Sequence, residues 1–215
     1  GSLGDDGWLP AGALADDGEG VGRTPGAIEI DKVEYLIDVP GVALAQVDVE
    51  TDGKTERFQE LSAPRCGTPG VPGLASIPVF TQLVAVPLGA QIEVAVKPGR
   101  VVTYQGMRVM PLQSDQVDYD GVEPSPFYIR KEYDLDVFYP ESLWSVDTGI
   151  IRGMRIAVIR VALGQFNGAT GVLRLYPELE VYVEFPGAQD RAPSSFALDE
   201  TRAPGFESIL GATLL

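Results

Sequence analysis

The sequence predicts an all-β protein, an antiparallel two-sheet β-sandwich of jelly-roll-like type with one short C-terminal helix. Three observations support this fold class. Apolar and polar residues alternate with the period of two that places one face of a strand in a core. Gly, Pro, Asp-Gly and Asn-Gly turn signals separate these segments at short intervals. Only the segment from Phe206 to Leu214 places its apolar residues on one helical face.

The first part of the chain begins without a strand pattern. Residues 1–26 are rich in Gly, Asp and Ala and are predicted to be an irregular lead-in. The alternation of Ala27–Asp31 predicts the first strand. Val42–Glu50 predicts a second, and the Thr51–Lys54 turn returns the chain into Arg57–Leu61, so these segments form a hairpin.

The middle of the chain alternates strands with breaks. A Pro- and Gly-dense stretch over Pro64–Pro78 interrupts regular structure. Strands are then predicted at Val79–Val86, Gln91–Lys97 and Val101–Met110. Residues 112–142 are rich in Asp, Pro and Tyr and are too polar for a central strand, so they are predicted to form a long loop, a class that is often functional.

Three further strands and one helix complete the chain. The strands are predicted at Met154–Leu163, Leu173–Tyr176 and Glu178–Phe185, and the helix follows Pro204-Gly205. The sandwich is therefore expected to extend over residues 27–204, and residues 205–215 form a helical junction.

Composition excludes most catalytic chemistry. The chain has no histidine, which removes Ser-His-Asp and Cys-His mechanisms and imidazole zinc sites, and Cys66 is its single cysteine. No catalytic residue, metal or cofactor is therefore expected. A net charge of −15 and the lack of a long apolar run make nucleic acid and membrane partners improbable. A pair of carboxylates acting on a glycosidic bond stays possible.

Four groups of short motifs occur in order over about residues 65 to 210. They are Gly67-Thr68-Pro69 with Ile77-Pro78-Val79 and Leu83 to Pro87; Val109-Met110-Pro111 with Pro126-Phe127-Tyr128, Tyr133 and Asp136 to Pro140; Arg152 to Ala162 with Leu173 to Tyr176 and Leu179 to Val183; and Gly205 to Ile209. In this order they resemble the propeptide of the gingipain family of secreted bacterial cysteine peptidases. The sequence departs from that pattern by about six extra residues, Gly70 to Ala75.

The resemblance implies a non-catalytic prodomain of a peptidase zymogen. Such a domain assists the folding of a caspase-fold cysteine peptidase, as an intramolecular chaperone, and keeps it latent by placing a loop in its active-site cleft. The implied partner is the cognate catalytic domain, and the implied location is secreted: periplasm, cell surface or extracellular space. Cleavage at Arg202 or beyond Leu215 would separate the two domains.

The resemblance also implies which residues form the inhibitory loop. The family's loop follows the proline at position 111 and presents a basic residue to the peptidase. Counting without gaps from Pro111 to Phe138-Tyr139-Pro140 places Asp118 there, with Asp120 as the near alternative. The loop is expected to comprise Val117, Asp118, Tyr119, Asp120 and Gly121, and the reversed charge predicts a peptidase that cleaves after Asp.

A secreted carbohydrate-binding or adhesin-like β-sandwich is the main alternative. Exposed aromatic rings would stack on sugars in such a module, and the sequence offers Trp8, Trp144, Tyr119, Tyr128, Tyr133 and Tyr139. Asp118, Asp120 and Glu123 do not have the spacing of an EF-hand calcium loop. A carboxylate hydrolase is the third possibility.

Overall fold

The computed structural model describes residues 7–11, 20–29, 31–51, 53–114, 126–151 and 153–188. Within these ranges the chain forms strands and one short 3-10 helix, η1 (Lys131–Asp134). All pairings between the strands are antiparallel. The predicted all-β antiparallel fold class is confirmed, although the described strands form four hydrogen-bonded sheets where two were predicted. The predicted helix within residues 205–215 lies outside the described residues.

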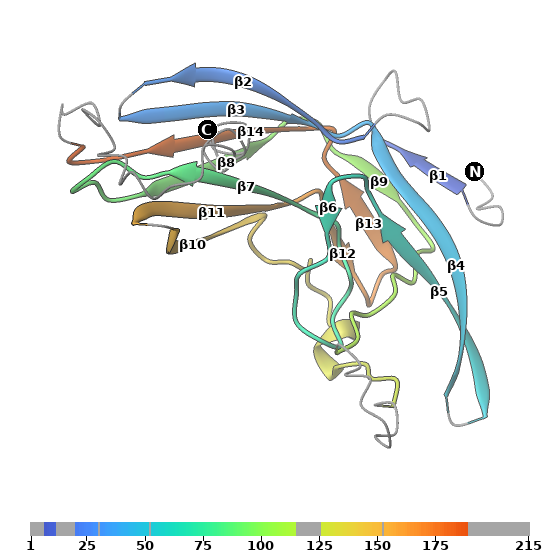
Figure 1. Cartoon of the computed structure of the whole chain (residues 1–215). Helices are drawn as coiled ribbons and strands as arrows, with labels where there is room; N and C mark the ends of the chain where they lie inside the picture. Colours follow the sequence, from blue (N-terminus) through green and yellow to red (C-terminus); the bar gives the residue numbers. More distant parts are fainter. Residues whose placement is uncertain are drawn as a thin grey trace.

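Hydrogen bonding divides the strands into four sheets (Figure 1). The first contains β1 (Gly7–Pro10), β4 (Gly41–Thr51) and β5 (Lys54–Ser62). The second contains β2 (Gly22–Ile28), β3 (Lys32–Asp38), β14 (Glu178–Glu184) and β8 (Glu93–Pro98). The third contains β10 (Trp144–Ile151), β11 (Met154–Ala162), β7 (Val79–Ala85) and β6 (Cys66–Gly67), and the fourth contains β12 (Gly164–Asn167), β13 (Val172–Leu175) and β9 (Val102–Tyr104).

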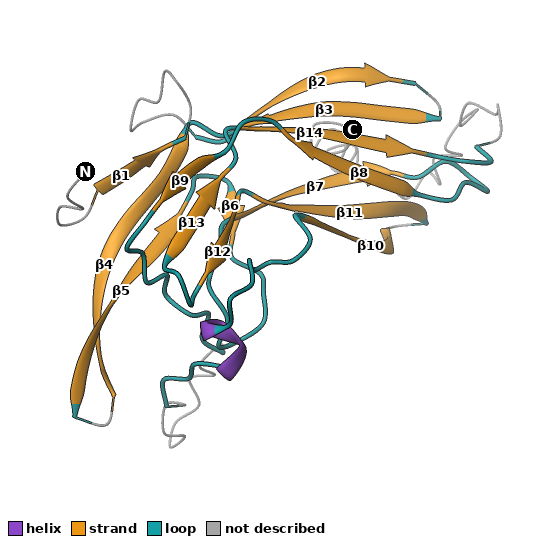
Figure 2. Ribbon diagram, turned by 180° about the vertical axis from the view of Figure 1, so that it is seen from behind, coloured by secondary structure: helices purple, strands orange, loops and turns teal. Residues whose placement is uncertain are grey.

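The chain passes from one end of the molecule to the other at bends between successive strands. In both views the β2-β3-β14-β8 sheet covers the β10-β11-β7 strands, and the other two sheets lie at the opposite end (Figures 1 and 2). Two of these bends meet, because the Val39 N–H donates to the Pro177 carbonyl at 2.7 Å. Prolines 40 and 177 lack the N–H that would continue a ladder, so each ends a strand where the sheets divide.

One hydrophobic core runs through all four sheets. Strand β14 shows how the sequence pattern produces it, because Leu179, Val181 and Val183 are at most 1% exposed, whereas Glu178, Glu180 and Glu184 of the same strand are exposed. Each such side chain contributes about 1.5–3 kcal/mol when it is fully buried. The predicted alternation of residues 178–185 therefore marks a true core face.

Two predicted segments differ from the structure. Parts of the predicted irregular lead-in are strands, since β1 pairs with β4 and β2 begins at Gly22. Leu9 is 5% exposed, so this short apolar segment joins the core despite its polar surroundings. The predicted strand Ala27–Asp31 crosses a turn between β2 and β3, closed by the Glu29 N–H on the Lys32 carbonyl at 2.7 Å.

The sequence pattern also predicted one strand too long and did not predict two others. Only Val102–Tyr104 of the predicted strand Val101–Met110 is in a sheet, and β10 and β12 were not predicted. These are short or edge strands whose pairing depends on distant neighbours.

Candidate functional site

The residues predicted for the inhibitory loop lie outside the described part of the chain. These are Val117, Asp118, Tyr119, Asp120 and Gly121, and the predicted processing residue Arg202 is outside it as well. The structure does describe both ends of this segment, up to Ser114 and from Pro126. The candidate site is therefore built from these two ends, which lie beside η1 at the end of the molecule away from β10 and β11 (Figure 2).

The end that enters the segment is hydrogen-bonded to two neighbours. The Met110 N–H donates to the Gln59 carbonyl of β5 at 2.8 Å, and the Leu112 N–H donates to the Leu74 carbonyl at 2.8 Å. Between them Pro111 forms an isolated bridge with Ala75. Backbone contacts therefore fix the chain as far as residue 112.

The end that leaves the segment is held by ring packing and by η1. The Phe127 ring lies 5.4 Å from the Phe58 ring of β5, centroid to centroid. Tyr133 of η1 is 4% exposed, and its hydroxyl donates to the Val109 carbonyl. The two ends are thus joined to the same scaffold, since Val109 precedes the segment and Tyr133 follows it.

The side chain of Gln113 connects the two ends directly. Its Oε1 accepts the Tyr128 N–H at 2.9 Å, and its Nε2 donates to the Tyr128 carbonyl at 3.1 Å. Nε2 also donates to the Pro111 carbonyl at 2.9 Å. The oxygen and the nitrogen of this amide bond to Tyr128 in the way that the C=O and N–H groups of a neighbouring strand would. The Gln113 side chain therefore closes the base of the segment.

Arg108 forms ion pairs with carboxylates of two different elements near these contacts. Arg108 Nη1 is 2.6 Å from Asp134 Oδ1 of η1, and Nη2 is 3.7 Å from Glu56 Oε2 of β5. The same guanidinium lies over the Tyr133 ring, 4.8 Å from its centroid. Burial raises the pKa of Tyr133, so its hydroxyl keeps its proton and donates it at all ordinary pH values. Arg108 therefore connects η1 to β5 across the base of the segment.

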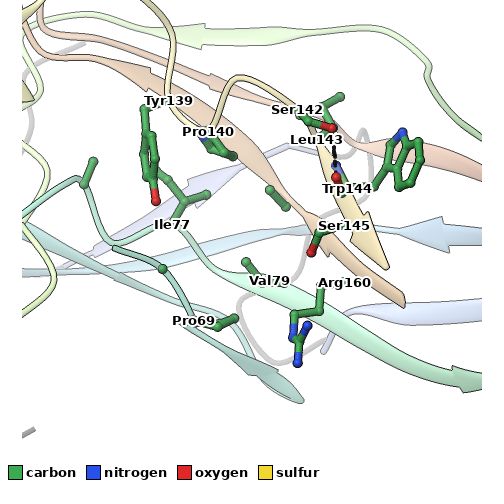
Figure 3. A pocket seen from close by; sticks show the side chains of 13 residues that line it. Pro69, Ile77, Val79, Tyr139, Pro140, Ser142, Leu143, Trp144, Ser145 and Arg160 are labelled. Atoms are coloured by element: carbon green, nitrogen blue, oxygen red, sulfur yellow. Dashed lines mark hydrogen bonds between the residues drawn. The ribbon is translucent and has the colours of Figure 1, made fainter. Parts of the chain in front are cut away.

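An apolar hollow of about 410 Å³ lies between β7, β11 and the chain that enters β10 (Figure 3). Tyr139 and Pro140 line one side and Trp144 and Ser145 the other, with Ile77 and Val79 at its floor. Its one charged lining residue, Arg160, forms an ion pair with Asp147. Apart from the Tyr139 hydroxyl and the ion-paired Arg160, none of its lining side chains is an acid or a base.

Of the described aromatic residues considered for sugar binding, only Tyr139 and Trp144 share a site, on opposite sides of the hollow. Tyr133 is buried and Tyr119 lies outside the described residues, whereas Tyr128 is 52% exposed. The Tyr139 hydroxyl accepts the Val71 N–H at 3.3 Å and so supports a loop. Their scatter among loops and core does not favour stacking on a sugar ring.

Cys66 of β6 is half-buried, and burial raises the pKa of its thiol to about 11. A thiol that stays protonated at neutral pH is a poor nucleophile. In the described ranges no group of three or more His, Cys, Asp or Glu side chains is arranged to hold a metal ion. No helix within those ranges has the length and apolar character needed to span a bilayer.

Sequence reasoning missed the residues that hold the segment in place. Gln113, Arg108 and Gly73 carry no motif, because their partners lie 15 to 57 residues away, in the pairs Gln113–Tyr128, Arg108–Asp134 and Gly73–Arg130. The one local signal is the Pro72-Gly73 dipeptide, which indicates a turn but does not identify the residues that the turn contacts.

Comparison with known sequences gives a family match. The sequence model of the Propeptide_C25 family matches residues 29–199. Lys-gingipain of Porphyromonas gingivalis is 30% identical over 167 residues, which is 74% of this chain and 10% of that protein. Gingipain R1 of the same organism is 23% identical over 120 residues, 55% of this chain and 12% of that protein. The chain spans about a tenth of the length of the curated relatives it matches.

Two solved structures have the same fold. One concerns the zymogenic latency of gingipain K from Porphyromonas gingivalis, with a TM-score of 0.69, 25% identity, and coverage of 86% of this chain and 100% of that chain. The other is a complex of Porphyromonas gingivalis RgpB pro- and mature domains, with a TM-score of 0.67, 19% identity, and coverage of 89% of this chain and 96% of that chain. The second likeness shows the fold alone.

Proposed function

Because the chain belongs to the Propeptide_C25 family, we propose that it is a prodomain that assists the folding of a cysteine peptidase and keeps it latent by placing a loop in the active-site cleft. The resemblance to gingipain propeptides is confirmed, and the chain is a non-catalytic part of a peptidase precursor. The peptidase domain, its caspase-like fold, and secretion to the periplasm, cell surface or medium belong to the proposal.

One observation carries the inhibitory part of the proposal. The segment between Gln113 and Tyr128 is fixed at both ends, by the Gln113 amide and by the packing of Phe127 on Phe58. A segment anchored at both ends loses less conformational freedom on binding than a free peptide does. Modest contacts in a cleft would then suffice for tight inhibition.

The folding part follows from the sandwich itself. One core joins the four sheets, so the folded domain offers a preformed surface to its partner. Contacts that this surface makes only with the folded peptidase would stabilise the folded state of the peptidase by mass action. The similarity to a structure concerned with zymogenic latency supports the inhibitory part of the proposal.

Asp118 is the residue proposed to enter the specificity pocket, with Asp120 as the near alternative. A carboxylate in a buried pocket requires a cationic partner, and arginine offers it two parallel hydrogen bonds. The proposed peptidase therefore cleaves after Asp, and Arg202 is the proposed processing site.

The test adds the purified domain to the mature peptidase domain of the same precursor. We expect stoichiometric, saturable inhibition of peptide hydrolysis and a higher yield of active peptidase when the two are refolded together. Bovine serum albumin at the same concentration is the control. Full activity at a large excess of the domain, with no gain in refolding yield, would contradict the proposal.

A further inference from the structure

The segment Gly70–Ala75 contacts both ends of the candidate inhibitory segment. On the entering side, the Gly73 N–H donates to the Leu112 carbonyl at 2.7 Å, and the Leu74 carbonyl accepts the Leu112 N–H. On the leaving side, the Gly73 carbonyl accepts the Arg130 N–H at 3.0 Å. Gly73 therefore lies between the two ends and bonds to each with its own backbone.

The Arg130 side chain adds a second bond on the leaving side. Its Nε donates to the Pro72 carbonyl at 3.1 Å. Arg130 directly precedes η1, so this bond also connects Gly70–Ala75 to the helix. Two successive carbonyls, those of Pro72 and Gly73, thus accept from one residue.

Glycine suits position 73 for two reasons. Its φ is +85°, in the region that other residues rarely adopt. A Cβ there would lie 2.7 Å from Tyr128 Cε1 and 2.8 Å from Arg130 Cγ, both closer than van der Waals contact allows. The backbone can approach the leaving end this closely because residue 73 has no side chain.

Gly70–Ala75 is itself fixed to the core. The Val71 N–H donates to the Tyr139 hydroxyl, Ala75 is 5% exposed, and the Ser76 N–H donates to the Met110 carbonyl at 2.8 Å. Tyr139 in turn pairs with Phe166 of β12 through two backbone bonds of 2.8 Å. The segment is thus a rigid support rather than a loop that follows its neighbours.

We propose that Gly70–Ala75 is a clamp that holds both ends of the inhibitory segment at a fixed separation, and that Gly73 is its positioning residue. The inference rests on the proposed function, since the clamp matters for latency only if that segment binds a peptidase. Fixing both ends from one side reduces the freedom that the segment must lose on binding. Residues 70–75 therefore increase the affinity of inhibition through the positions at which they hold the two ends of the segment.

Gly73→Ala is the main test, with Gly53→Ala as its matched control. Gly53 has φ +71° in the β4–β5 turn, and no atom lies within 4 Å of a Cβ there. Both variants place a Cβ on a residue of positive φ, but only Gly73→Ala brings that Cβ against Tyr128 and Arg130. We expect Gly73→Ala to raise the inhibition constant by about tenfold and Gly53→Ala to change it less than about twofold.

Hydrogen–deuterium exchange of the free domain gives a readout independent of inhibition. The Leu112 and Arg130 amides should exchange faster in Gly73→Ala than in wild type and stay protected in Gly53→Ala. Arg130→Leu, which removes the Pro72 bond and adds no clash, should raise the inhibition constant by about threefold. This variant decides the question if Gly73→Ala fails to fold.

The outcomes separate the clamp from the proposed function. If the wild-type domain inhibits and Gly73→Ala shows faster exchange yet inhibits equally well, the clamp is refuted and the prodomain role stands. Unchanged exchange at Leu112 and Arg130 in both variants would also refute the clamp. If the wild-type domain does not inhibit the peptidase, the proposed function fails and the clamp's role in latency fails with it.

Discussion

The side-chain amide of Gln113 pairs with both backbone groups of Tyr128, accepting its N–H at 2.9 Å and donating to its carbonyl at 3.1 Å. The two residues are 15 positions apart, so the pair closes the base of the segment between them. The Gln113 side chain thus bonds to the two backbone groups of Tyr128 that a neighbouring strand would otherwise satisfy. The segment proposed to inhibit is therefore held by one residue as well as by the backbone of Gly73.

Replacing Gln113 by Met keeps the length of the side chain and removes three hydrogen bonds. Each exposed or half-exposed bond contributes about 0.5–1.5 kcal/mol net, and part of this reappears as the ordering cost of binding. Inhibition should weaken by about three- to tenfold. Titrating the peptidase activity with each variant measures this loss of inhibition. Gln91→Met, at an exposed residue away from the segment, is the control. Equal inhibition by both variants would show that the pair has no role in binding.

Replacing residues 114–123 by a short Gly/Ser linker should abolish inhibition. The thermal unfolding midpoint should change little, because the described core contacts lie outside this segment. Inhibition assays and calorimetry on the same preparations measure the two effects. Retained inhibition would place the contact elsewhere on the sandwich.

Asp118→Ala should weaken inhibition by roughly two to three orders of magnitude. Removing one partner of a buried ion pair costs about 3–5 kcal/mol, because the other charge is left without a partner. Asp115→Ala, nearer the start of the segment, is the control and should have little effect. A substrate library then reports the preference of the mature peptidase, and a strict preference for Arg or Lys before the cut would refute the reversed charge.

Tyr133→Phe tests the contact between η1 and the chain before the segment. It removes the bond to the Val109 carbonyl, and a buried carbonyl without a partner costs about 1–3 kcal/mol. The free energy of unfolding in urea should fall by about that amount. Tyr128→Phe, at a ring that is 52% exposed, should leave it nearly unchanged. An equal loss in the two variants would argue against a stabilising bond at Tyr133.

Cys66 should react slowly with thiol reagents in the folded protein. Its pKa is raised by burial from 9.0 to about 11, so at pH 8 the thiolate is about a hundredfold rarer than in a free thiol. The folded state binds the proton more tightly, so this group's stabilising contribution is full below pH 9 and is lost as pH rises towards 11. A chromogenic disulfide reagent, with and without urea, measures the rate. Rapid reaction without urea would contradict the burial of this thiol.

The alternating pattern of β14 and the Asp-Gly turn between β4 and β5 were predictable from sequence because each is a local property. The segment 178–185 encodes its own core face, and Gly53 supplies the positive φ that its turn requires. Strand β1 was missed because Leu9 joins the core only once β4 lies beside it. Short edge strands of this kind depend on their partners for stability.

By itself the sequence determined the β-rich, antiparallel class, the absence of histidine chemistry and the order of motifs that marks a gingipain-type propeptide. These follow from composition and from patterns a few residues long. Only the tertiary structure decided that Gly73 lies between Leu112 and Arg130 and that Gln113 pairs with Tyr128. Such contacts join residues far apart in the chain, and they form where the folded core brings the backbones within hydrogen-bonding distance, which no local pattern encodes.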